Sequence, residues 1–206
     1  MMSKIKSETL DSKHDVNTEI ADKRLGMTVL IYSVIMLASS FMPEESVLVW
    51  FMINCVFTII VLLMLFMLWK RYKYDSVKYY SYQVYFMLMG IVFFGVTPIL
   101  KITYPSIIFW VIIFFTFAVL AITHLFRKRI VVSFVNKKHR LLLTILSLYV
   151  MLMSVLAIIL THFMRNNVST EKLGMAILFY LLSALFMVIS PAFIVSKEDV
   201  EKLKAV

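Results

Sequence analysis

Charged side chains are missing from six long stretches of this 206-residue chain. All 33 Lys, Arg, Asp and Glu residues fall outside these stretches, and only four Gly and four Pro occur in the whole chain. A charge inside a bilayer is costly and usually marks a transport or relay site. Because the six stretches contain no charged residue, they give no such indication of a transport or relay site. With 62% hydrophobic residues and a mean hydropathy of +0.91, the chain leaves no room for a sizeable water-soluble domain.

Motifs that carry common enzyme chemistry are also missing. The sequence contains no HExxH, CxxC or GxSxG pattern. Cys55 is the only cysteine, so a disulfide within one chain is impossible. Of the four His, His124 and His162 are expected near opposite faces of a membrane, where they cannot share a metal. We therefore expect neither a catalytic site nor a bound metal or cofactor.

What the sequence does contain is six apolar runs of helical length. Each is long enough, or nearly so, to cross about 30 Å of hydrocarbon, and in that medium the backbone must pair internally as a helix. The first run is the weakest, because Ser33, Ser39 and Ser40 dilute it and Pro43 closes it early. The sequence predicts an all-α integral membrane protein with transmembrane helices at about 25–42, 46–69, 79–100, 104–126, 141–164 and 173–195.

The distribution of Lys and Arg predicts the orientation of these spans. Alternate gaps hold 18 of these residues on one side and three on the other, one of the three being Lys101 in the expected fourth gap. By the positive-inside rule, residues 1–24 form a polar cytoplasmic arm and residues 196–206 a charged cytoplasmic tail. The outer turns are then short, while 70–78 and 127–140 are basic cytoplasmic loops. The expected location is the plasma membrane.

Aromatic residues near the run ends are typical of interfacial anchors. Trp50 and Trp110 are expected near the outer face, whereas Trp69 ends the second run on the cytoplasmic side. Tyr79 and Tyr80 belong to a tyrosine-rich segment that suits the headgroup level. No basic helix is expected to accompany the charge of the loops, so the bilayer is the expected partner and nucleic acid is not.

A few uncharged polar residues lie inside the runs, where such groups usually bond to a neighbouring helix. The candidates for helix contact or solute contact are Asn54, Thr58, Gln83, Thr97, Ser183 and Ser190. Thr97-Pro98 and Ser190-Pro191 end the third and sixth runs alike, and inverted halves with interrupted helices are typical of transporters. A second echo, Ser46–Trp50 against Ser106–Trp110, pairs the first hairpin with the second instead, so the two repeats are incompatible and indicate chance matches. The alternative function is a small transporter or channel for a neutral or hydrophobic solute, with its site formed where Asn54, Gln83, Thr97 and Ser190 converge.

A third hypothesis is a lipid-modifying enzyme whose site lies at the outer interface. His162, Arg165 and Glu171 would have to meet there. Loss of activity on His162→Ala would be required.

The chain as a whole consists of a polar arm, three helical hairpins and a short charged tail. This arrangement resembles that of a known group of proteins, and the resemblance is strongest over Met1–Val49. It is similar to uncharacterised small membrane proteins encoded beside type VII secretion genes in staphylococci. The resemblance implies an accessory membrane subunit or an immunity factor against a membrane-acting toxin, and it assigns no functional residue. Together with the uncharged spans, it favours a noncatalytic protein that acts through helix contacts with a membrane-protein partner or in a homo-oligomer.

Overall fold

The computed structural model describes residues 18–44, 46–72, 74–135, 141–164 and 168–195, and within these ranges the chain is helical and contains no strand. The elements in chain order are α2 (Thr18–Phe41), α3 (Val47–Tyr72), α4 (Ser76–Thr103), α5 (Ile107–Leu125), α6 (Arg127–Val135), α7 (Leu141–Met164), α8 (Val168–Ile189) and the 3-10 helix η1 (Ser190–Ile194). The all-helical fold expected from the apolar runs is thus confirmed for the described residues.

Five of these elements are long and apolar enough to cross a membrane: α3, α4, α5, the Leu143–Leu160 part of α7, and α8 continued by η1. The weak first run lies in α2, whose apolar part, Leu25–Phe41, is shorter than the other five. This agrees with the dilution of that run by serine. The chain is therefore a multi-pass membrane protein by the length and composition of its helices.

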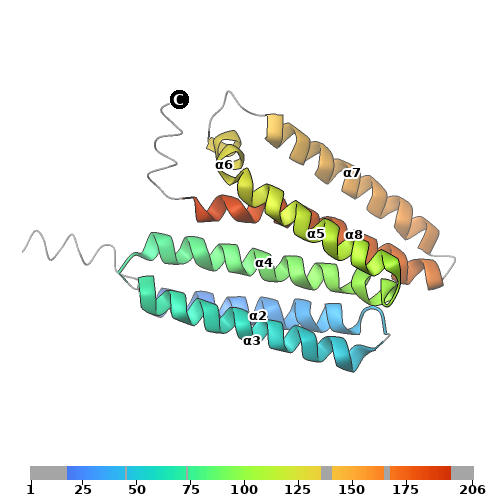
Figure 1. Cartoon of the computed structure of the whole chain (residues 1–206), viewed down its shortest axis with the longest axis horizontal. Helices are drawn as coiled ribbons and strands as arrows, with labels where there is room; N and C mark the ends of the chain where they lie inside the picture. The colour runs from blue at the N-terminus through green and yellow to red at the C-terminus, as the bar shows by residue number, and fades with distance from the viewer. Residues whose placement is uncertain (1–17, 45, 73, 136–140, 165–167, 196–206) are drawn as a thin grey trace, which may run out of the picture.

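Helices α4 and α8 pack against each other over the most extensive interface of the bundle and form its centre. Helices α2 and α3 pack on one another and on α4, while α5 packs on both central helices and α7 mainly on α8. Successive long helices run in opposite directions, so that α2 begins and η1 ends at the same end of the bundle (Figure 1). We call the opposite end, which holds the α2–α3, α4–α5 and α7–α8 connections, the turn end.

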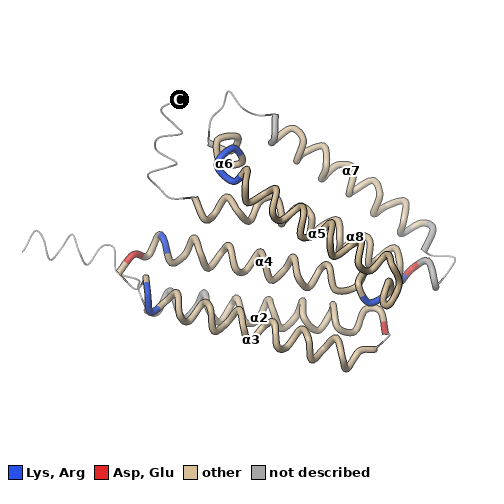
Figure 2. The backbone as a smooth tube through the Cα atoms, in the orientation of Figure 1, with Lys and Arg blue, Asp and Glu red and all other residues tan. Residues whose placement is uncertain are grey.

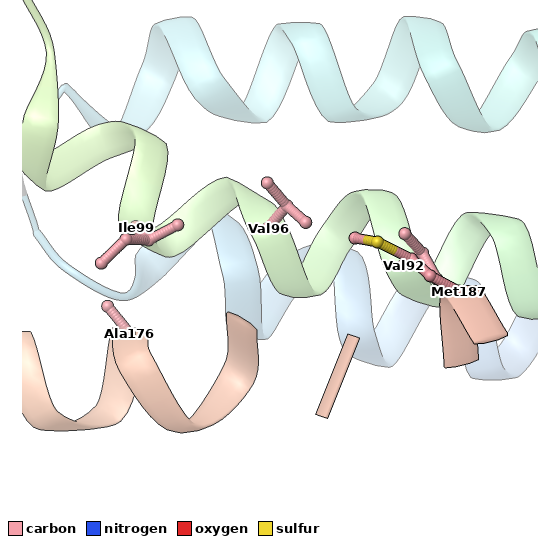
Figure 3. Close-up of a cluster of buried hydrophobic side chains, with 5 residues drawn as sticks. All are labelled: Val92, Val96, Ile99, Ala176 and Met187. Carbon is pink, nitrogen blue, oxygen red and sulfur yellow. The ribbon is translucent and has the colours of Figure 1, made fainter. Parts of the chain in front are cut away.

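The centre of the bundle is a cluster of apolar side chains between α4 and α8. Val92, Val96 and Ile99 recur at helical spacing along α4 and meet Ala176 and Met187 of α8 (Figure 3). All five are at most 7% exposed. The pairing of Ile99 with the early part of α8 and of Val92 with its later part follows from the antiparallel arrangement.

Two glycines of α4 allow two different helices to approach it. A Cβ on Gly90 would overlap the Tyr32 ring of α2, and a Cβ on Gly95 would overlap the Ser183 hydroxyl of α8. Five residues correspond to about 140° around a helix, so these glycines face different neighbours. Their spacing does not match the GxxxG motif, in which both glycines serve one interface.

Helix α6 differs from the expected basic loop. The connection at 127–140 was expected to be a loop without a basic helix, but its first nine residues are helical. Arg127, Lys128 and Arg129 are exposed there, whereas Ile130 and Val131 are buried. In Figure 1, α6 is seen nearly end-on while the long helices lie in the page, so it lies across the end of the bundle. A short helix with a charged side and a buried apolar side suits the membrane interface.

Charged residues of the described ranges gather at the two ends of the bundle, and the stretch between them is uncharged (Figure 2). The end where α3 meets α4 and α5 meets α6 carries Lys70, Arg71, Lys78, Arg127, Lys128 and Arg129, with Asp75 as an acidic residue. Helix α2 also begins there, and its sequence adds Glu19, Asp22, Lys23 and Arg24. We call this end the basic end. Asp75 accepts a hydrogen bond from the Lys78 backbone N–H at 3.0 Å and so caps the start of α4.

Candidate functional site

Five polar side chains from three helices meet inside the bundle near its turn end, and we call them the polar cluster. They are Ser39 and Ser40 of α2, Asn54 of α3, and Thr97 and Lys101 of α4. None is more than 4% exposed. An unpaired polar group costs several kcal/mol in such surroundings, so the partners of each side chain decide what the cluster can do.

Lys101 is the charged member of this cluster. The apolar run was expected to end before it, at residue 100, and to leave Lys101 in a turn, but α4 continues to Thr103 and Lys101 is buried. Its ammonium donates to the Ser40 carbonyl at 2.6 Å and to the Pro43 carbonyl at 2.5 Å. The last carbonyls of a helix lack intrahelical donors and carry partial negative charge, so the end of α2 provides acceptors for a cation.

Asn54 links all three helices through its side-chain amide. Its nitrogen donates to the Ser40 hydroxyl at 2.8 Å and to the Ser39 hydroxyl at 3.2 Å, and its oxygen accepts from Thr97 at 3.4 Å. The amide therefore uses both donors and one acceptor site. The two serine hydroxyls in turn donate to the Met36 carbonyl, as helical serines commonly do.

The geometry of the polar cluster is that of an interhelical clamp. Each of its side chains bonds to a neighbouring helix, to its own backbone or to both, and none of the five lines the two cavities described below. Such bonds between transmembrane helices contribute roughly 1 kcal/mol each. The cluster therefore fixes α2 and α3 against α4.

The remaining residues expected to contact a helix or a solute lie elsewhere. Thr58 bonds to the Asn54 carbonyl one turn before it in α3 and contacts the Met36 sulfur of α2 at 3.7 Å. Ser183 bonds to the Phe179 carbonyl in α8. Gln83 donates to the Thr28 hydroxyl of α2 at 3.4 Å. Ser190, at the start of η1, contacts the sulfur of Met89 at 3.5 Å.

Consequently the four residues expected to converge in a transporter do not share one site. Asn54 and Thr97 meet in the polar cluster, but Gln83 and Ser190 contact other residues, each on a different pair of elements. Neither Gln83 nor Ser190 lines either described cavity.

A second polar contact joins α4 to α5. His124 is bonded through Nδ1 to the Leu120 carbonyl at 2.7 Å and through Nε2 to the Tyr85 hydroxyl at 2.9 Å. Since a carbonyl only accepts, Nδ1 carries a proton and donates it to Leu120, while Nε2 shares a hydrogen bond with the Tyr85 hydroxyl. This contact holds α5 against α4 away from the polar cluster.

The aromatic residues expected at the interfaces differ in their surroundings. Trp110 is 65% exposed near the start of α5, whereas Trp50 and Trp69 are half-buried near opposite ends of α3. Tyr79 is only 2% exposed and packs with Leu68, Trp69, Tyr72 and Tyr80 in a small cluster between α3 and α4. Tyr79 therefore packs against protein, while Trp110 presents its ring to the surroundings.

An apolar groove runs along the side of α4, between α3 and α5. It encloses about 420 Å³ and is lined by Phe57, Met89, Val92, Phe93, Val96, Leu100, Ile113, Thr116, Phe117 and Leu120. Thr116 is its polar side chain, and that hydroxyl bonds to the Ile112 carbonyl at 2.8 Å and lies 3.3 Å from the Tyr180 hydroxyl. The groove thus offers only apolar surface to an occupant.

The residues of the lipid-modifying hypothesis are in part outside the described ranges, since Arg165 is not described. Glu171 lines an open cavity at the turn end, and His162 does not. Among the described residues, no group of three or more His, Cys, Asp or Glu side chains could hold a metal ion.

Comparison of the chain with protein families, with curated proteins and with solved structures gave no match.

Proposed function

We propose that this protein is a noncatalytic multi-pass membrane protein that acts through helix contacts with a membrane-protein partner. The observation that carries the proposal is a difference between two sides of the helix bundle. On one side, the hydrogen bonds of the polar cluster hold α2 and α3 against α4, and the side chains of the cluster are bonded to one another and to backbone carbonyls. On the other side, almost none of the residues in the apolar parts of α5 and α7 are fully buried.

The exposed side chains of α5 and α7 are large and apolar. Phe114 and Phe117 of α5 are 76% and 66% exposed, and Ile158 of α7 is 71% exposed. Together with the apolar groove beside α5, they fit an apolar transmembrane helix of a partner. Packing and shape, rather than charge, would govern such an association in lipid.

The proposal includes six transmembrane spans in the plasma membrane, with both termini in the cytoplasm. The apolar part of α2, Leu25–Phe41, extends about 26 Å, close to the roughly 30 Å of hydrocarbon, and the packing of α2 beside α3 and α4 supports its role as the sixth span. The Lys and Arg residues gathered at the basic end support a cytoplasmic placement of that end by the positive-inside rule. The turn end then faces outward.

The resemblance to proteins encoded beside type VII secretion genes supports two classes of partner, a secretion subunit or a membrane-acting toxin. The test is mild crosslinking in native membranes, purification in mild detergent, and mass spectrometry of the copurifying proteins. A stoichiometric membrane protein or toxin is the expected result. Recovery of the chain alone would contradict the proposal.

A further inference from the structure

An open cavity of about 370 Å³ lies at the turn end, between the end of α2 and the beginning of α8. Its α2 side is formed by Phe41, Met42, Pro43 and Glu44, its α8 side by Glu171, Lys172, Met175, Ala176 and Phe179, and its floor by Pro98 of α4. We call it the turn-end cavity. It is separate from the polar cluster, although the Pro43 carbonyl accepts a bond from Lys101 behind it.

The lining of this cavity changes character with depth. Glu44, Glu171 and Lys172 stand at the turn end, whereas the residues that follow along α8 toward the middle of the bundle, from Met175 to Phe179, are apolar. Lys172 and Phe179 are separated by about 10 Å along the helix axis. A phospholipid has the same order of chemistry over that distance, with charges at the headgroup and hydrocarbon below it.

The charges at the rim select among headgroups. Two carboxylates and one ammonium suit a ligand that carries a positive group next to a phosphate, because Lys172 can pair with the phosphate and Glu44 and Glu171 with the positive group. A headgroup with a phosphate and no positive charge would bring a net negative charge against two carboxylates. Both carboxylate side chains are exposed, so they are free to turn toward a headgroup.

We propose that the turn-end cavity binds a zwitterionic phospholipid with an ammonium headgroup, with Glu44 and Glu171 on the ammonium, Lys172 on the phosphate and an acyl chain along Met175 and Phe179. The site needs a chain placed in a membrane but no protein partner. Its failure is therefore distinguishable from failure of the proposed function, which the copurification experiment tests separately.

The experiment uses the purified full chain in mild detergent with short-chain phosphatidylethanolamine or phosphatidylglycerol, and native mass spectrometry counts bound lipid. The unmodified chain is expected to retain phosphatidylethanolamine with roughly fivefold higher affinity, a factor within the range of exposed charge pairs. The double variant Glu44→Gln with Glu171→Gln is expected to lose this preference. Lys172→Gln is expected to weaken the binding of both lipids, since both carry the phosphate.

Arg129→Gln is the matched control, because Arg129 is exposed at the opposite end of the bundle and should leave both affinities unchanged. The Glu44, Glu171 and Arg129 side chains are exposed and Lys172 is half-buried at the cavity rim, so the variants are expected to fold. Equal affinity of the unmodified chain for the two lipids would overturn the proposal. An unchanged preference in the double carboxylate variant would overturn it as well.

Discussion

Lys101 of α4 donates a hydrogen bond to the carbonyl of Pro43, at 2.5 Å, just beyond the end of α2. A second bond reaches the Ser40 carbonyl at 2.6 Å, so one ammonium joins the end of one helix to the last turn of another. These bonds stabilise a cation that is buried in the bundle. The end of α2 supplies both oxygen acceptors and the partial negative charge of a helix C-terminus.

Replacing Lys101 by Met is expected to destabilise the protein. The substitution keeps a long side chain but leaves the Ser40 and Pro43 carbonyls without this donor, at a cost of roughly 1–3 kcal/mol. The apparent melting temperature in mild detergent should fall, whereas Lys172→Met, a control at the half-buried rim of the turn-end cavity, should change it little. An unchanged or higher melting temperature for Lys101→Met would show that desolvation of the ammonium outweighs its bonds.

Replacing Asn54 by Leu is expected to loosen α2 and α3 from α4, because the substitution removes bonds to Ser39, Ser40 and Thr97 together. A loss of about 1–2 kcal/mol is expected from bonds of this kind between membrane helices. Unfolding in mixed detergent micelles measures it. Thr58→Val serves for comparison and should cost less, since the Thr58 hydroxyl bonds to its own helix and its contact with α2 is to the Met36 sulfur, a weak acceptor. Equal stability of Asn54→Leu and the unmodified chain would contradict the clamp.

The glycines of α4 give a prediction with an internal control. A Cβ at Gly90 overlaps Tyr32 and one at Gly95 overlaps Ser183, whereas a Cβ at Gly26 meets no atom within 4 Å. Gly90→Ala and Gly95→Ala should therefore lower the melting temperature. Gly26→Ala should leave it unchanged or raise it slightly, since Ala favours a helix over Gly by about 1 kcal/mol. A similar response at all three positions would refute close packing of α4 against α2 and α8.

The orientation can be checked by labelling single cysteines on intact cells in a Cys55→Ser background. Glu44 at the turn end and Lys128 on α6 are both exposed. With a membrane-impermeant maleimide, Glu44→Cys should react at once and Lys128→Cys only after permeabilisation. The reverse pattern would place the basic end outside and contradict the positive-inside assignment.

The helical membrane fold was predictable from the sequence because run length and hydropathy alone determine it. The polar cluster was predictable only in part. Asn54 and Thr97 were expected at helix contacts, but Ser39 and Ser40 had been read only as diluting the first run. Lys101 was expected in a turn because the third apolar run, as its hydropathy defines it, ends directly before this first charged residue.

The spacing between Lys101 and Thr97 in the sequence nevertheless indicates that Lys101 belongs to the polar face of α4. Lys101 follows Thr97 by four residues and therefore lies on the same face of α4 as that polar side chain. The carbonyls that accept its bonds are backbone groups in the last turn of α2 and just beyond it, and no sequence pattern identifies them. The contacts of Gln83 with Thr28 of α2 and of Ser190 with Met89 of α4 could not be foreseen either, because each joins side chains that are far apart in the sequence.

The most direct test of partner binding is site-specific photocrosslinking in native membranes. A photoreactive amino acid is placed at Phe117, which lines the apolar groove on α5, at Ile158 on α7, or at Val56, which is 58% exposed on α3. We expect a discrete crosslinked protein from Phe117 or Ile158 and none from Val56. Labelling of lipid alone at all three positions would contradict the proposal that α5 and α7 bind a membrane partner.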